Sequence, residues 1–288
     1  MLRIRPGILL IIALFTSLVA RAQSNPENES QLLRPVVSAF MLEYGSENIR
    51  DTYLTPLKYK GWNAALSYER MQAMRFNPER WIMQLDARLS LGRMLNPAYT
   101  SLMWQFAFSP SWSMMWRTRL PMGFTLAAGG NIGADIGAIY LPRNGNNPAS
   151  AKASLTIAAT AMAVWNGKIG RLPLTVRYQP VVPLTGVFFS PDYDELYYEI
   201  WLGNHQGLSH CAWPGNFFRL DNLLTADLHF GNTTLRVGYR CNIFSGKSGN
   251  IVNRDVAHCF VLGVATELIS LRAGTSHTPD ARIISSLY

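Results

Sequence analysis

Two adjacent residues late in the chain, Ser209 and His210, are of the types that could perform nucleophilic chemistry. A serine hydroxyl activated by a histidine base attacks esters in many hydrolases, and Asp221 is a candidate to orient that base. Neighbouring side chains on a strand point to opposite faces, so this pair could meet only in a loop. None of the five histidines has a serine two positions later, the spacing that would place both groups on one strand face. The sequence therefore favours a polar loop here, and lipid hydrolysis is the weaker alternative.

An acidic cluster precedes this pair and could hold a metal ion; its members are Asp192, Asp194, Glu195 and Glu199. Carboxylate oxygens are suitable ligands for Ca²⁺. The simpler interpretation is a solvated loop that enters a strand, with Glu199 paired to an interior arginine. His205 and His210 are five positions apart and do not have the spacing of a known zinc motif. We therefore expect no catalytic residue, no metal and no cofactor.

Strands must position these residues, because apolar and polar positions alternate through most of the chain. From Trp81 to Leu91 every odd position is apolar, whereas the even positions from Gln84 to Gly92 are polar or glycine. Such alternation predicts a strand with two different faces. Comparable alternation occurs in residues 61–71, 174–179, 222–230, 233–244 and 256–268. Gly231-Asn232 separates two of these runs and predicts a tight hairpin.

The composition of the two faces indicates which solvent each one meets. The polar sets contain small residues and charges of both signs, and the whole chain has only five lysines. A face in bulk water would carry more lysine and glutamate, whereas an enclosed lumen needs small residues and paired charges. Aromatic residues gather near the ends of the runs, as at a bilayer interface. We therefore expect an all-β fold, a transmembrane antiparallel up-and-down β-barrel of about 12 strands, with 10 as the alternative. A secreted β-sandwich is less consistent with these patterns.

Seven charged residues on the polar faces are expected to line the barrel interior: Glu69, Asp86, Arg88, Arg177, Asp227, Arg236 and Arg240. In a barrel of this size, opposite charges can pair and side chains can largely fill the lumen. This predicts a structural or accessory barrel with a mostly plugged lumen. Arginine exceeds acid in this set, so a narrow pore for anionic solutes is the alternative.

The start of the chain predicts export. Arg3 and Arg5 precede an apolar stretch from Gly7 to Ala20, and Ala20-Arg21-Ala22 has the small-x-small form of a signal-peptidase site. We therefore expect a signal peptide at 1–22, a flexible arm at 23–34 and the barrel at 35–288. Removing 1–22 lowers the net charge to 26 − 3 − 18 = +5. These charges are scattered, so membrane lipids and an outer-membrane protein complex are the expected partners, and nucleic acid is not.

Three strings of residues carry a resemblance to a known family: 51–71 (DTYLTPLKYKGWNAALSYERM), 140–153 (YLPRNGNNPASAKA) and 186–204 (GVFFSPDYDELYYEIWLGN). They resemble uncharacterised outer-membrane β-barrels of Bacteroidetes, classified as a domain of unknown function. The resemblance implies a barrel integral to the outer membrane and implies no reaction. Family members often have Gly and Gln where Asp194 and Glu195 stand here, so no role for this segment is transferred.

Overall fold

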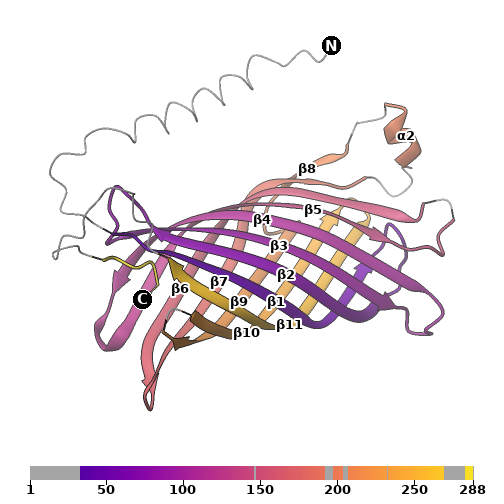
Figure 1. The fold of residues 1–288 in the computed structure, drawn as a ribbon. Helices are drawn as coiled ribbons and strands as arrows, with labels where there is room; N and C mark the ends of the chain where they lie inside the picture. The colour runs from indigo at the N-terminus through magenta and orange to yellow at the C-terminus, as the bar shows by residue number, and fades with distance from the viewer. Residues whose placement is uncertain are drawn as a thin grey trace, which may run out of the picture.

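The fold is a closed antiparallel β-barrel, seen in a computed structural model that describes residues 33–145, 147–191, 197–203, 207–231, 233–268 and 283–287 (Figure 1). Strands adjacent in sequence pair with each other, and β1 pairs with β11 to close the ring. The ten long strands are β1 (Val36–Asp51), β2 (Tyr59–Ala73), β3 (Trp81–Leu95), β4 (Leu102–Arg119), β5 (Phe124–Tyr140), β6 (Ala149–Ile169), β7 (Leu172–Phe189), β9 (Phe217–Phe230), β10 (Thr233–Ser248) and β11 (Ile251–Leu268).

The barrel has the ten strands of the alternative count and not twelve. Between β7 and β9, the described residues form a short helix, α2 (Tyr197–Trp201), and a four-residue strand, β8 (Ser209–Ala212). β8 adds to β7 only at one end, because it is too short to cross the barrel. The C-terminal stretch also adds no strand in its described part, where it forms a single bridge from Ile283 to Leu33.

The two ends of the barrel differ in their connections. At the end that carries the described chain termini, here called the terminal end, strands are joined by residues 74–80, 120–123, 170–171 and 231–232. At the opposite end, the loop end, the connections are 52–58, 96–101, 141–148, 190–216 and 249–250. Figure 1 shows α2 and β8 at the loop end, far from the C-terminus. The predicted hairpin lies at the terminal end, where Gly231 has the positive φ of 63° that a tight turn requires.

The outward face of the barrel is apolar on every strand. In β3, Leu85, Leu89 and Leu91 are exposed, whereas Ile82 and Gln84 on the other face are buried. Each long strand contributes an exposed large apolar or aromatic side chain, for example Phe40, Leu66, Leu89, Phe106, Ile132, Leu155, Tyr178, Leu224, Tyr239 and Leu262. The two-faced strands predicted from the sequence are therefore present, with their apolar sides turned outward.

The helices are short. Besides α2, the described chain has one 3₁₀ turn, η2 (Pro121–Gly123). In the described ranges, no helix is both long and apolar enough to pass through a bilayer.

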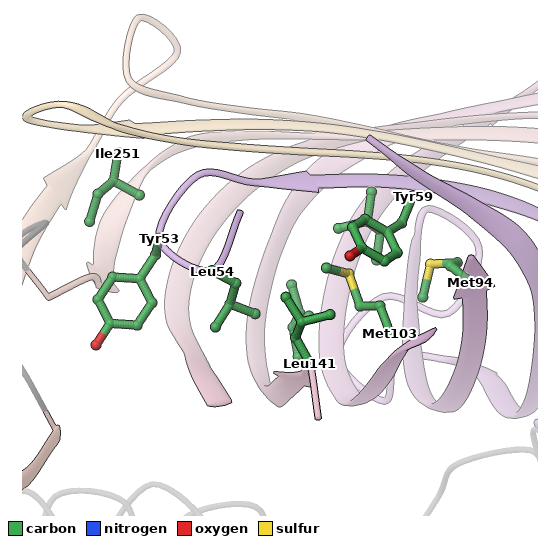
Figure 2. Close-up of a cluster of buried hydrophobic side chains, with 9 residues drawn as sticks. Tyr53, Leu54, Tyr59, Met94, Met103, Leu141 and Ile251 are labelled. Carbon is green, nitrogen blue, oxygen red and sulfur yellow. The ribbon is translucent and has the colours of Figure 1, made fainter. Parts of the chain in front are cut away.

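The inward face builds a core in layers along the barrel axis. At the terminal end, an apolar layer consists of Val37, Met71, Ile82, Met115, Ala127, Met162, Val164 and Leu287. A polar and charged layer follows, and a second apolar cluster lies at the loop end. In that cluster Tyr53 and Leu54 of the β1–β2 connection lie against the strand residues Ile49, Tyr59, Met94, Met103 and Ile251 (Figure 2). Side chains thus fill much of the space that the ring of strands encloses.

Candidate functional site in the barrel interior

Glu69, Arg177, Arg236 and Asp227 form a buried network across the lumen, here called the closing network. Arg177 donates two hydrogen bonds to the Glu69 carboxylate, at 2.8 and 2.7 Å. Arg236 donates to Glu69 at 2.9 Å and to both oxygens of Asp227 at 2.7 Å. Glu69 on β2 and Arg177 on β7 stand on opposite walls, five strands apart around the ring of ten. Their contact therefore spans the lumen and closes it.

Burial makes this network costly to leave incomplete. All four side chains are at most 2% exposed. Charges taken out of water must be paired and hydrogen-bonded, because an isolated buried charge costs several kcal/mol. The fork geometry of arginine matches the two oxygens of a carboxylate, so each guanidinium here makes a two-bond contact. Every charge of the closing network is thus paired, and the buried Nε of Arg177 is its one donor nitrogen without a hydrogen-bond partner in the described chain.

Two glutamine side chains add a neutral layer to the closing network. Gln84 on β3 and Gln179 on β7 exchange amide hydrogen bonds, at 3.1 and 2.6 Å. Gln84 also donates to Glu69 at 3.3 Å. Because β3 and β7 lie four strands apart, this pair also crosses the lumen.

A second charged group surrounds Glu43, nearer the loop end. Arg88 and Arg240 both donate to the Glu43 carboxylate, at 2.8 and 3.0 Å, and Ser67 donates to it as well. Arg240 also pairs with Asp221 at 2.7 Å. Asp221 is therefore an ion-pair partner of an arginine on the lumen wall.

The C-terminal stretch closes the terminal end. Leu287 is buried in the apolar layer there. Arg117 of β4 donates to the carbonyl oxygens of Ser285 and Ser286 at 2.6 and 2.9 Å, and also to Pro78 and Glu79 of the β2–β3 connection. One arginine thus holds two chain segments across the opening.

The loop-end half of the lumen contains a cavity of about 230 Å³. All ten long strands contribute to its walls, and its lining includes Asp86, Asp135, Arg219, Phe217 and Ser248. Arg219 pairs with Asp135 and lies over the rings of Phe217 and Phe244, at 5.9 and 5.4 Å. This cavity has room for a small molecule.

Three carboxylates of the cavity wall, Glu47, Asp86 and Asp255, have no cation within 4.0 Å among the described residues. Glu47 accepts a hydrogen bond from Asn63 at 2.9 Å, and Asp255 accepts one from Gln105 at 3.5 Å. Interior acids also include Glu43, Asp51, Asp135 and Asp221, none of which the sequence analysis assigned to the lumen. The structure therefore adds more acid than arginine to the interior, contrary to the expected excess of arginine, so its charge does not favour an anionic solute.

Above the cavity, α2 is fixed to the barrel by Tyr197. Its hydroxyl accepts a hydrogen bond from the Ala151 backbone N–H at 2.5 Å, and its ring meets Tyr53 edge to face at 5.8 Å. Burial raises the pKa of Tyr197 to about 12, so the phenol stays protonated at neutral pH. The long β7–β9 connection is thus tied to the loop-end apolar cluster.

All seven residues predicted to line the interior lie on inward positions. Six of them belong to the two ion-pair groups described above, and Asp86 faces the cavity. Sequence reasoning missed Glu43, although it alternates with Phe40, Leu42 and Tyr44 on the opposite face, a pattern that could have identified it. Gln84 and Gln179 were missed because only charged residues were considered.

The three candidate residues for hydrolysis do not come together. Ser209 lies exposed on β8, and Asp221 pairs with Arg240. The His210 ring instead lies against Ser248, with 2.9 Å from Nε2 to Oγ, and 3.0 Å from the Ser190 carbonyl oxygen. Ser248 is distant from His210 in sequence, so no local spacing could have indicated this pair.

The candidate calcium ligands Asp192, Asp194 and Glu195, and the candidate zinc ligand His205, lie outside the described residues. Glu199 lies on α2. Across the described ranges, no group of three or more His, Cys, Asp or Glu residues is arranged to hold a metal ion.

Several solved outer-membrane β-barrels are similar to this chain. The outer membrane protease OmpT from Escherichia coli is 6% identical, with 85% of this chain and 99% of that chain covered and a TM-score of 0.47. The translocator domain of the autotransporter NalP from Neisseria meningitidis is 12% identical, with 91% and 98% covered and a TM-score of 0.37. An outer membrane channel from Pseudomonas putida F1 is 9% identical, with 85% and 99% covered and a TM-score of 0.33. Likenesses this distant transfer no activity.

The comparison with curated proteins gives no match. A family described as "Protein of unknown function (DUF3316)" matches residues 8–275. This match confirms the expected family of unknown function, whereas the Bacteroidetes origin stays a prediction. The chain belongs to the DUF3316 family.

Proposed function

We propose that this protein is an integral β-barrel of the bacterial outer membrane whose lumen is closed, and that it acts as a structural or accessory component of the envelope. The apolar outward face supports the membrane location. Exposed apolar side chains occur on all ten long strands, far beyond the isolated patches of a soluble protein. The strands have 14 to 21 residues, longer than the roughly 9–11 residues that a tilted strand needs to cross a bilayer. The leader proposed at 1–22 would direct export.

Aromatic residues on the outward face are consistent with this location. Tyr44 stacks on Trp62 with ring centres 6.3 Å apart, and Phe124 meets Trp165 at 6.5 Å near the terminal end. Tyrosine and tryptophan prefer the level of the lipid headgroups. Outer-membrane barrels have short periplasmic turns and longer outer loops. The terminal end would therefore face the periplasm, and the loop end would face outward.

The closing network is the single observation that carries the proposed closed state. It joins opposite walls through buried, fully paired charges, and the apolar layer with Leu287 lies beyond it. A conducting pore needs a continuous water path, which these two layers interrupt. A role that does not require transport through the lumen, such as support of a partner in the outer membrane, fits this arrangement better than a narrow pore.

Planar-bilayer recording tests the closed lumen directly. The barrel should insert without discrete conductance steps, while a general porin reconstituted in parallel gives steps under the same conditions. Migration of the folded barrel in an unheated gel confirms that the sample is intact. Sizeable, reproducible steps from folded protein would refute the proposal and support a pore.

Gentle-detergent purification from the native membrane tests the accessory role, which predicts a constant co-purifying outer-membrane protein.

A further inference from the structure

We propose that the outward face of β1, β2, β3 and β11 near the loop end binds a phosphorylated lipid of the outer leaflet; this inference rests on the proposed membrane location and orientation. Four basic side chains lie on this face, one on each strand, and are here called the basic row: Arg50, Lys60, Arg93 and Arg254. They occupy outward positions of the strand alternation. Arg50, for example, is exposed between the buried Ile49 and Asp51.

Strand register makes the basic row continuous. Arg50 on β1 and Arg254 on β11 are direct register partners. Lys60 on β2 is diagonal to Arg50, and Arg93 on β3 is diagonal to Lys60. Side chains at direct and diagonal positions of neighbouring strands lie about 5 to 8 Å apart. One headgroup with several negative charges can therefore contact more than one member of the row.

The charge of the basic row is not balanced by acids on the same face. No member of the row has a carboxylate oxygen within 4.0 Å in the described part of the chain. The nearby acids Glu47, Asp51 and Asp255 occupy inward positions. Like charges directly opposite each other on a sheet are destabilising, so the neighbours Arg50 and Arg254 cost free energy until an anion binds them. The row is thus complementary to an anionic ligand.

The residues that follow the basic row along the barrel identify this ligand as a lipid. From the loop end, the outward positions of β1 are Arg50, Asn48, Ser46, Tyr44, Leu42 and Phe40. This order, from charged through polar and aromatic to apolar, follows a bilayer leaflet from its headgroups to its acyl chains. A lipid with its phosphate on the row would therefore place its acyl chains along Leu42 and Phe40, which are 65% and 62% exposed. A free phosphate would use only the first of these layers.

The opposite side of the barrel has a neutral surface at the same end. On β5 and β6, the outward positions next to the loop end are Ala138, Tyr140, Ala149 and Ala151. None of these side chains is charged at neutral pH. The positive charge of the basic row is therefore confined to one sector of the rim, as expected of a binding site and not of a general membrane anchor.

Lipid A, which carries phosphates on a sugar headgroup with several acyl chains, is the probe for this site. Folded barrel in a neutral detergent is titrated with lipid A, and bound lipid is counted by native mass spectrometry. The double substitution Arg50→Gln with Arg254→Gln should lower the apparent affinity about 25-fold, because each basic residue near an anionic lipid surface contributes about fivefold. The matched control is Arg119→Gln with Lys168→Gln, which removes the same charge from exposed positions at the terminal end and should leave the affinity unchanged.

Two further measurements separate a lipid site from a site for free phosphate. Dephosphorylated lipid A with the same acyl chains should bind wild type and the double variant equally, and excess inorganic phosphate should not displace lipid A. Equal affinity of wild type and the double variant for lipid A, or displacement by inorganic phosphate, would overturn the inference. The proposed closed barrel would stand in either case, provided that the protein still migrates as a folded barrel in an unheated gel and inserts into bilayers without conductance steps. Should the double variant not fold, wild type decides: an affinity for lipid A that does not fall as salt is raised would overturn the inference.

Discussion

The two halves of the lumen are built from the same strands and have opposite character. Toward the terminal end, the closing network pairs every charge in two-bond contacts, and an apolar layer seals the space beyond it. Toward the loop end, a cavity remains, and carboxylates such as Asp86 and Asp255 face it without a cation in the described chain. The strand pattern is the same in both halves, so side-chain choice alone makes one half a seal and the other a site.

The boundary between the halves falls within one pair of register partners. Glu69 on β2 stands directly opposite Asp86 on β3. Glu69 joins the closing network, whereas Asp86 turns to the cavity. Two carboxylates on adjacent strands at the same level thus belong to different halves, which allows a comparison by matched substitutions.

The largest expected effect follows removal of the Glu69 charge. Glu69→Gln keeps the side-chain shape but removes the carboxylate that the buried Arg177 and Arg236 share. The Asp227 carboxylate, which pairs with Arg236, is then the one acid left in the closing network. Breaking a buried ion pair from one side typically costs about 3–5 kcal/mol. We expect a loss of that order in the free energy of unfolding from lipid vesicles, measured by urea titration with tryptophan fluorescence. A loss below about 1 kcal/mol would show that the closing network does not stabilise the seal.

The seal also depends on the C-terminal stretch. Its buried Leu287 and its exposed Ile283 provide a matched pair of apolar residues for substitution. Leu287 is 4% exposed in the terminal-end apolar layer, whereas Ile283 is 55% exposed. Truncating a buried leucine to alanine costs about 2–5 kcal/mol, and at the mouth of the lumen we expect the low end. Ile283→Ala should change the same unfolding energy by less than about 0.5 kcal/mol. Equal effects of the two substitutions would mean that the stretch is not seated in the barrel.

The sequence predicts much of which residues face the lumen, because successive side chains on a strand point to opposite faces. Alternation identifies which residues face inward, so Glu69, Arg177 and Arg236 were selected without a structure. It does not say which inward residues meet, because contacts across the lumen depend on strand number and register. The sequence leaves the strand number open between twelve and ten, and the structure has ten long strands, because the described residues between β7 and β9 form only α2 and the short β8.

The pair formed by Ser248 and His210 shows the other limit of sequence reasoning. Ser209 was the candidate nucleophile because it is adjacent to His210 in sequence, yet adjacent side chains on a strand point to opposite faces. His210 instead meets a serine from the end of β10, because the long β7–β9 connection folds back over the loop end. Contacts of this kind arise from loop geometry, which periodic patterns do not encode.

The smallest expected effect concerns Asp86, the register partner of Glu69. Asp86→Asn removes the same charge as Glu69→Gln with equal conservation of shape, but Asp86 has no cation within 4.0 Å in the described chain and faces the cavity. No buried partner is left uncompensated, and repulsion from the neighbouring Glu69 carboxylate is relieved. We therefore expect the unfolding energy to change by less than about 0.5 kcal/mol or to rise slightly, in the same urea titration. A loss as large as that of Glu69→Gln would erase the boundary between the two halves, because it would place Asp86 in the network that seals the lumen.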